Sequence, residues 1–172
     1  MKYTKVRKVK SPTRAHPTDA GIDFFVPEDL TPEVIDEKTA MTGSSIIASV
    51  KDGIVKSISL EPNESVLIPS GIKVKVPEGY MLQFSNKSGV ASKRGLVVGA
   101  SIVDVGYEGE CHIDLHNVSR KIQTIYAGDK IVQGILVPVN FALPEEVPTA
   151  EELYAGSTSD RGEGGFGSSG TK

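Results

Sequence analysis

The sequence contains no tryptophan and only one cysteine, Cys111. A single cysteine can form neither a disulfide within the chain nor a cysteine-based zinc site, as expected of a protein in a reducing compartment. No segment approaches the ~20 consecutive apolar residues that a membrane-spanning helix needs. The N-terminal residues MKYTKVRKVK also lack the apolar core of a signal peptide. These absences predict a cytoplasmic protein with no membrane segment.

An excess of positive charge is also absent, because 19 lysines and arginines stand against 22 aspartates and glutamates, for a net charge of −3. This balance argues against general affinity for nucleic acid or anionic membranes, so local cations would have to bind any anionic ligand. The length of 172 residues suffices for one sizeable core. We expect one domain over residues 1–150, followed by a flexible arm over residues 151–172 that is rich in Glu, Ser and Gly.

Short segments rich in valine and isoleucine recur along the first 139 residues, separated by Gly, Pro, Asn or Asp. In SGIKVKVPEG the apolar residues Ile72, Val74 and Val76 alternate with polar ones, which is typical of a half-buried strand. Similar patterns predict strands within residues 2–10, 66–69, 80–85, 95–98, 101–103, 110–119 and 131–139. Many short strands separated by turns predict an all-β sandwich or barrel.

Helix is indicated at two places only. KSGVASKR (87–94) is long enough for one or two turns. In TPEVIDEKTA (31–40), Thr31 is placed as the N-cap before Pro32 at the first helical position.

The second of these helices belongs to a segment, residues 28–59, that we interpret as a self-contained insertion between core strands. Within it, Asp52-Gly53 lies between two β-rich runs and predicts a hairpin. The segment is also a possible contact surface for a protein partner.

Polar, glycine-rich clusters interrupt the strand pattern. They are TDAGIDF (18–24), NKSGVASKRG (86–95), VGASIVDVGYEGE (98–110), AGDKIVQ (127–133) and RGEGGFGSSG (161–170). They supply carboxylates (Asp19, Asp23, Asp104), cations (Lys87, Arg161) and aromatic rings (Tyr107, Phe166). Glycine-rich backbone beside a cation suits a polyphosphate, an aromatic ring suits a base, and a carboxylate could deprotonate a water. Because no G-x-x-x-x-G-K-[ST] motif is present, we expect a nucleoside triphosphate hydrolase without a P-loop.

In this order the clusters resemble the motifs of the trimeric dUTPase family, RGEGGFGSSG being the most specific and GYMLQFSNKSG matching the second motif region. The resemblance implies a jelly-roll-like β-barrel with one short helix and the inserted segment, assembled as a homotrimer with shared active sites. It also implies hydrolysis of dUTP to dUMP and pyrophosphate with Mg²⁺. The C-terminal arm would then cross to a neighbouring subunit and close over the bound nucleotide.

The resemblance also implies residue roles. Asp104 would activate the water that attacks the α-phosphorus, and Tyr107 would pack on the deoxyribose and exclude a 2′-hydroxyl. Asp23 would support the metal indirectly, through its water shell, or would support neighbouring polar groups. The implied phosphate contacts are Lys87 (where the family usually has Arg), Ser88, Gly89 and Gln133, and the uracil edge would be read by backbone groups of Gly99, Ala100, Ser101 and Ile102. From the arm, Arg161 would contact the γ-phosphate and Phe166 would stack on uracil. Gly167, Ser168 and Ser169 would surround the terminal phosphate.

Three alternatives stay open at this point. NKSGVASKRGL and DVGYEGECHIDLHN also resemble dCTP deaminase, alone or combined with dUTP hydrolysis, with Asp114 where those enzymes place a catalytic Glu. A nucleotide-gated regulatory protein could act through residues 28–59. Separately, His112, Asp114 and His116 share one strand face, which we interpret as a solvated or interface face in preference to a metal site.

Overall fold

The computed structural model describes residues 1–160 and 162–164. The chain folds as two units, Met1–Asn140 and Phe141–Lys172. The last strand of the first unit ends at Pro138, and the chain that follows forms no further strand in the described residues.

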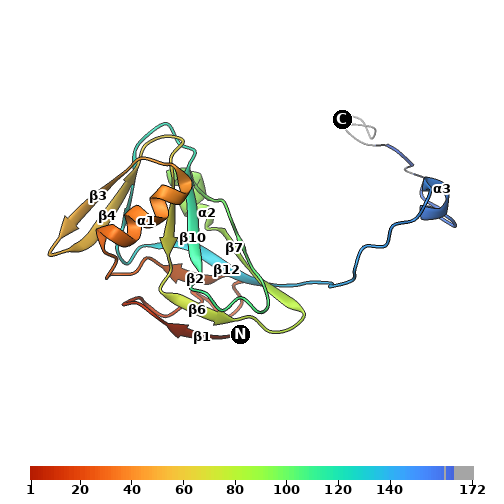
Figure 1. The fold of residues 1–172 in the computed structure, drawn as a ribbon, viewed down its shortest axis with the longest axis horizontal. Coiled ribbons are helices and arrows are strands. Elements are labelled where there is room, and N and C mark those ends of the chain that lie inside the picture. Colours follow the sequence, from red (N-terminus) through yellow and green to blue (C-terminus); the bar gives the residue numbers. More distant parts are fainter. Residues whose placement is uncertain (161, 165–172) are drawn as a thin grey trace. The chain divides into compact units, whose positions relative to one another are not determined.

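The first unit is mostly β, as the sequence predicts (Figure 1). Its strands are β1 (Lys2–Lys5), β2 (Ile22–Phe25), β3 (Ile46–Lys51), β4 (Ile54–Leu60), β5 (Ser65–Pro69), β6 (Ile72–Lys75), β7 (Tyr80–Asn86), β8 (Leu96–Val98), β9 (Ile102–Val103), β10 (His112–Asn117), β11 (Gln123–Tyr126) and β12 (Lys130–Pro138). The helices of the described residues are α1 (Pro32–Thr42), α2 (Ser88–Arg94) and, in the second unit, α3 (Ala150–Leu153). None of these helices is long and apolar enough to cross a membrane.

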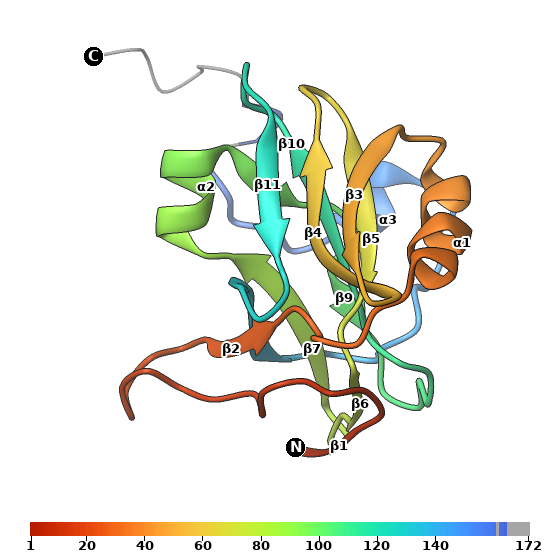
Figure 2. The same ribbon diagram turned by 90° about the vertical axis from the view of Figure 1, so that its left-hand side faces the viewer.

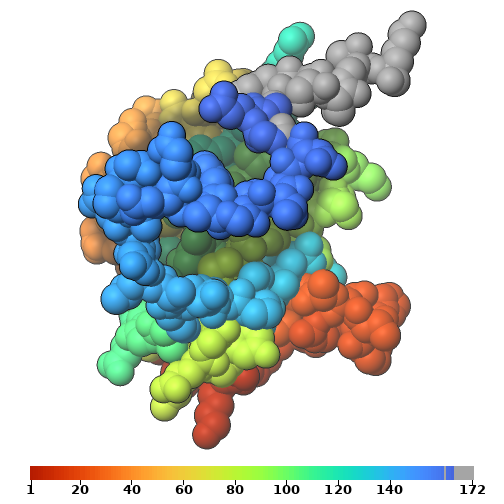
Figure 3. Space-filling model, turned by 90° about the vertical axis from the view of Figure 1, so that its right-hand side faces the viewer, coloured from red at the N-terminus to blue at the C-terminus, as the bar shows by residue number. Residues whose placement is uncertain are grey.

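The strands pair into small antiparallel sheets with the orders β1-β6, β5-β10-β8, β11-β4-β3 and β2-β12-β7-β9. These sheets make up the β structure of the described part of the chain. Helices α1 and α2 lie on opposite sides of the central strands (Figure 2). The β1-β6 pair is visible in the space-filling view, where red atoms of the N-terminus adjoin yellow-green ones (Figure 3).

Alternating burial fixes which face of each strand meets the core. On β10, Ile113 and Leu115 are fully buried, while the three polar residues between and beside them are half-buried on the opposite face. Phe24 of β2 and Phe84 of β7 meet edge to face, with ring centroids 5.0 Å apart. Gly134 of β12 permits this contact, because an added Cβ would lie 2.8 Å from the Phe24 ring.

The local signals for α1 and the β3–β4 hairpin are confirmed. Helix α1 begins after Thr31 with Pro32 at its start and ends at Thr42, and the C-cap Gly43 has the left-handed φ of +69°. In the hairpin, Asp52 and Gly53 have φ values of +54° and +74°. Two successive positive φ values match the twist of the flanking strands, which explains the Asp-Gly pair at this turn.

The interpretation of residues 28–59 as a self-contained segment is wrong. Strand β4 pairs along β11, with Ile58 opposite Ile125, and both side chains are buried. Leu30 and Ile35 of the same segment are also fully buried, and α1 packs against β5. Deleting the segment would therefore expose the core of the first unit rather than trim its surface.

Strands β2 and β11 are absent from the sequence-based prediction. β2 begins within the polar cluster TDAGIDF, where the buried Asp23 interrupts the apolar pattern. In the second unit, α3 is also an addition, and its N-cap Thr149 accepts a hydrogen bond from the Glu152 amide at 3.2 Å.

Candidate active site

A cavity of about 190 Å³ in the first unit collects several of the predicted site residues. It is lined by Ala100, Ser101, Ile102, Asp104 and Tyr107, together with Leu67, Phe84, Val103, Cys111 and His112. Among the predicted site residues, the catalytic carboxylate, the aromatic ring and most of the base-reading loop therefore share one cavity. Gly99 does not line it.

Asp104 follows β9 directly and its side chain is exposed. The turn after it is closed by a hydrogen bond from the Tyr107 amide to the Asp104 carbonyl at 3.3 Å, and Gly106 within the turn has φ +87°. A solvent-accessible carboxylate at the mouth of a cavity can accept a proton from a water molecule.

The ring of Tyr107 is held from two sides. Its hydroxyl donates to the carbonyl of Glu110 at 3.0 Å, and the ring rests on Gly109, where an added Cβ would overlap Tyr107 Oη. A side chain at position 109 would therefore displace the ring. The hydroxyl is satisfied within the protein, which leaves the ring face available for apolar contact.

The loop of residues 99–102 is anchored to β7 and β10. The Phe84 amide donates to the Ser101 carbonyl at 2.7 Å. The Ala100 amide donates to Asp114 Oδ2 at 2.8 Å, and the Gly99 amide donates to the Asp114 carbonyl at 3.0 Å. Asp114 was expected on this strand face, but its hold on the loop could not be read from the sequence.

The pKa of His112, which lines the cavity, is affected by a charge on α1. Burial lowers the pKa of His112, and Lys38 of α1 lowers it further, whereas Glu110 acts in the opposite direction. His112 is therefore neutral near pH 7. Because Lys38 belongs to residues 28–59, this segment influences the cavity as well as the core.

A cationic cluster forms where β2, β12 and the start of α2 meet. Asp23 is buried, and its two carboxylate oxygens pair with different lysines, Oδ1 with Lys87 Nζ and Oδ2 with Lys130 Nζ at 2.9 Å. Burial alone would raise the pKa of Asp23, but hydrogen bonds and charge from Lys87 and Lys130 outweigh it, so the pKa is lowered. Lys130 was not among the predicted site residues, although it lies in the AGDKIVQ cluster.

Gln133 connects this cluster to β7. Its Nε2 donates to the Asn86 carbonyl at 2.8 Å, and Asn86 Oδ1 accepts the Val98 amide at 2.7 Å. The Gln133 side chain fills the space beside Gly21, where an added Cβ would overlap it. Asn86 thereby ties Gln133 to β8, the strand that leads into the loop of residues 99–102, a link that sequence reasoning missed.

Ser88 and Gly89 open α2 next to Lys87. The amides of Val90 and Ala91 donate to the Lys87 carbonyl, at 3.0 and 2.9 Å. An added Cβ at Gly89 would meet no atom within 4 Å, so the surface beside this first turn is open.

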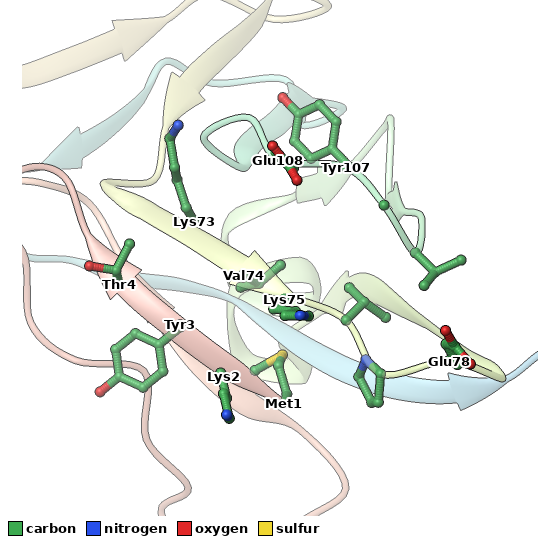
Figure 4. A pocket seen from close by; sticks show the side chains of 14 residues that line it. Met1, Lys2, Tyr3, Thr4, Lys73, Val74, Lys75, Glu78, Tyr107 and Glu108 are labelled. Carbon is green, nitrogen blue, oxygen red and sulfur yellow. The ribbon is translucent and has the colours of Figure 1, made fainter.

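The first unit has a second, larger cavity of about 720 Å³. Figure 4 shows Tyr107 and Glu108 on one side of it and Lys2 and Tyr3 of β1 on the other. Tyr107 lines both cavities, so the candidate site and this larger cavity share one residue.

Five predicted contacts of the arm, Arg161, Phe166, Gly167, Ser168 and Ser169, lie outside the described residues. Within residues 1–160 and 162–164, no group of three or more His, Cys, Asp or Glu side chains is arranged to hold a metal ion. Both oxygens of Asp23, the residue expected to support a metal's water shell, face ammonium groups.

A family model and curated relatives both match this chain, and their descriptions refer to the same kind of enzyme. A family model described as dUTPase matches residues 54–170. A deoxyuridine 5′-triphosphate nucleotidohydrolase of Leifsonia xyli subsp. xyli is 33% identical over 162 residues, which cover 92% of this chain and 84% of that protein. The enzyme of the same name from Wolbachia pipientis subsp. Culex pipiens is 38% identical, over 74% of this chain and 80% of its own.

Solved structures are similar as well. A mutant dUTPase of Staphylococcus bacteriophage 80alpha with dUpNHpp is 26% identical, with a TM-score of 0.71 over 98% of this chain and 97% of that one. A mutant dUTPase from phage phi11 of S. aureus, described with a structural Mg(II) ion, is 24% identical, with a TM-score of 0.64 over 87% of this chain and 97% of that one. At that identity the second likeness concerns the fold alone.

Proposed function

The chain belongs to the dUTPase family and is an enzyme of the dUTP diphosphatase class, and we propose that it hydrolyses dUTP at the cavity that holds Asp104. Its mostly β fold is of the dUTPase type. The observation that supports this site best is the presence of Asp104, Tyr107 and the loop of residues 100–102 around one cavity.

In the proposed reaction, the Asp104 carboxylate accepts a proton from a water molecule. The water oxygen forms a bond to the α-phosphorus, and the bond from that phosphorus to the oxygen bridging the α- and β-phosphates breaks. Pyrophosphate leaves and dUMP remains, while the proton passes from Asp104 to solvent. The exposure of the carboxylate at the cavity mouth supports this role, since both water and proton must reach it.

Selectivity for deoxyuridine follows from the cavity walls. The ring of Tyr107 packs on the deoxyribose and leaves no space for a 2′-hydroxyl. Backbone groups of residues 99–102 read the uracil edge, and their turn excludes a 5-methyl group. Support for this comes from the contacts that hold both walls in place, the Tyr107 hydroxyl to Glu110 and the Ala100 amide to Asp114.

The triphosphate binds beside the start of α2, at Lys87, Ser88, Gly89 and Gln133. Lys87 and Lys130 place two ammonium groups on one buried carboxylate there, and the helix start leaves open surface at Gly89. Anionic oxygens are stabilised by such cations and by amides at a helix start.

Magnesium is proposed as the cofactor and accompanies the nucleotide. Phosphate oxygens rather than protein carboxylates would hold it, in keeping with the pairing of both Asp23 oxygens to lysines. When bound, it would neutralise charge on the phosphates.

Assembly as a homotrimer is proposed to complete each active site. The residues that follow Asn140 fold as a unit of their own, which supports an arm that can serve a site on a neighbouring subunit. On that arm, Arg161 would pair with the γ-phosphate, Phe166 would stack on uracil, and Gly167, Ser168 and Ser169 would surround the terminal phosphate.

The test is a product assay on the full-length chain with Mg²⁺ and dUTP, dCTP, dTTP or UTP, resolved by chromatography. We expect dUMP and pyrophosphate from dUTP, with little turnover of the other nucleotides. Formation of dUTP or dUMP from dCTP would support the deaminase interpretation instead, and equal turnover of UTP would contradict the role of Tyr107. The geometry favours hydrolysis alone, because the Asp114 carboxylate lines neither cavity and faces the Ala100 amide.

A further inference from the structure

We propose that Asp114, supported by His116, is the positioning residue of the base-reading loop 99–102. This inference rests on the proposed function and adds a determinant of uracil binding on β10, behind the loop rather than in the cavity.

Asp114 holds the loop through both its side chain and its backbone. Oδ2 accepts the Ala100 amide at 2.8 Å, and the backbone carbonyl accepts the Gly99 amide at 3.0 Å. The Asp114 side chain is only 16% exposed, and its hydrogen bond to the Ala100 amide lies at the surface, where the loop covers the strand. One residue therefore fixes two successive peptide groups of the loop.

The position of Asp114 is itself rigid. It lies in the middle of β10, opposite Leu67 of β5, and β10 is the central strand of its sheet. The neighbouring residues Ile113 and Leu115 are fully buried in the core. A carboxylate anchored in this way cannot follow the loop if the loop moves.

His116 supports the carboxylate from one side. Its Nε2 lies 3.3 Å from Asp114 Oδ1, and it occupies the same strand face two residues along. Gly99 covers both side chains, and an added Cβ there would overlap Asp114 Oδ2 and His116 Nε2. The loop backbone, the carboxylate and the imidazole thus form one packed contact.

These contacts decide which polar groups of the loop can face a base. The amides of Gly99 and Ala100 and the carbonyl of Ser101 all form hydrogen bonds inside the protein. Their orientation sets the direction of the remaining peptide groups of Ala100, Ser101 and Ile102, which line the cavity. A base read by backbone groups binds tightly only when those groups are held in place beforehand.

Two substitutions at Asp114 test separately whether its hydrogen-bond acceptor or its negative charge holds the loop. Asp114→Asn retains an oxygen that can accept the Ala100 amide, whereas Asp114→Ala removes it. Asp36→Ala, which removes an exposed carboxylate on α1, is the matched control. KM and kcat for dUTP, the Kd for dUMP by calorimetry, and the thermal midpoint are measured for each variant.

We expect Asp114→Ala to raise both KM and the dUMP Kd about tenfold, since a positioned hydrogen bond is lost, while kcat changes less. For Asp114→Asn and the control, KM and the dUMP Kd should stay within about threefold of the values for the unchanged chain. Where Asp114→Ala fails to fold, Asp114→Leu, which is close to asparagine in size but offers no acceptor, gives the same comparison with Asp114→Asn.

Unchanged KM and Kd in Asp114→Ala, or an equal loss in Asp114→Asn, would overturn the inference. A wild-type chain that binds dUMP but does not hydrolyse dUTP would instead contradict the proposed function, and the dUMP Kd values would still test the loop. A wild-type chain that neither binds dUMP nor hydrolyses dUTP would contradict both.

Discussion

Asn117, the last residue of β10, is fully buried and connects three segments of the first unit. Its Nδ2 donates to the carbonyls of Leu60, Glu61 and Lys121 at 2.9, 3.1 and 2.8 Å. Its Oδ1 accepts the amide and the hydroxyl of Ser119 at 3.0 and 2.7 Å. Asn117 thus joins the ends of β4 and β10 to the turn that leads into β11.

Replacing Asn117 by alanine removes all these contacts and leaves polar groups without partners. A buried group that loses its hydrogen bond costs about 1–3 kcal/mol, and some of the freed carbonyls can still reach water, so we expect a loss of about 3 kcal/mol in the free energy of unfolding. Ser119→Ala is the graded comparison, because it removes only the hydroxyl and should cost about 1 kcal/mol.

Urea unfolding measures both values. Because the chain has no tryptophan, far-UV circular dichroism is the suitable signal, at a fixed protein concentration. A loss in Asn117→Ala no larger than that in Ser119→Ala would refute the reasoning that Asn117 holds these segments together.

Further predictions concern the site and its surroundings. Gly109→Ala should displace the Tyr107 ring and raise turnover of UTP relative to dUTP about tenfold, measured as a ratio of kcat/KM values. Burial raises the pKa of the Cys111 thiol to about 11, so a maleimide should modify it about 100-fold more slowly in the folded chain than in the unfolded chain at pH 8. The lowered pKa of Asp23 gives stability that is present above about pH 4 and lost as the pH falls through the folded-state pKa. Asp23→Asn should therefore lower the free energy of unfolding at pH 7, and its difference from the unchanged chain should shrink below about pH 4, measured by urea unfolding at each pH.

Local sequence signals predict those parts of the fold that depend on neighbouring residues. The start of α1 at Thr31 and Pro32 and the hairpin turn at Asp52 and Gly53 each follow from the backbone preferences of one or two residues. The strand faces follow in the same way, since Ile113 and Leu115 alternate with polar residues and are buried as expected.

Contacts between distant segments could not be predicted in this way. Asp23 lies in a polar cluster of the sequence, far along the chain from Lys87 and Lys130, and only the fold brings these two lysines to its oxygens. The segment 28–59 looked autonomous because it has its own helix and hairpin signals. Its burial depends on the pairing of β4 with β11, about 65 residues further along, and no local pattern encodes that pairing.

In the candidate site, too, local sequence predicts contacts between near neighbours but not those between distant segments. Asp104 and Tyr107 lie three residues apart in one turn, so the sequence places them together and the structure puts both on one cavity. The hold of Asp114 on Ala100 crosses from β10 to the loop before β9, and the spacing of polar residues along β10 predicts only that they share a face. Packing decides which backbone groups form hydrogen bonds with the polar face of β10.

The role of Asp104 as the base is tested most directly by the rate of dUTP hydrolysis in Asp104→Asn, measured beside the dUMP Kd and compared with Glu108→Gln as the matched control. The asparagine cannot accept the proton of the attacking water, so turnover should fall on the order of 10²- to 10⁴-fold while the dUMP Kd and the thermal midpoint stay unchanged. Glu108→Gln, four residues along the same loop, should retain normal turnover. A folded Asp104→Asn that binds dUMP and hydrolyses dUTP at a rate near that of the unchanged chain would contradict the proposed mechanism.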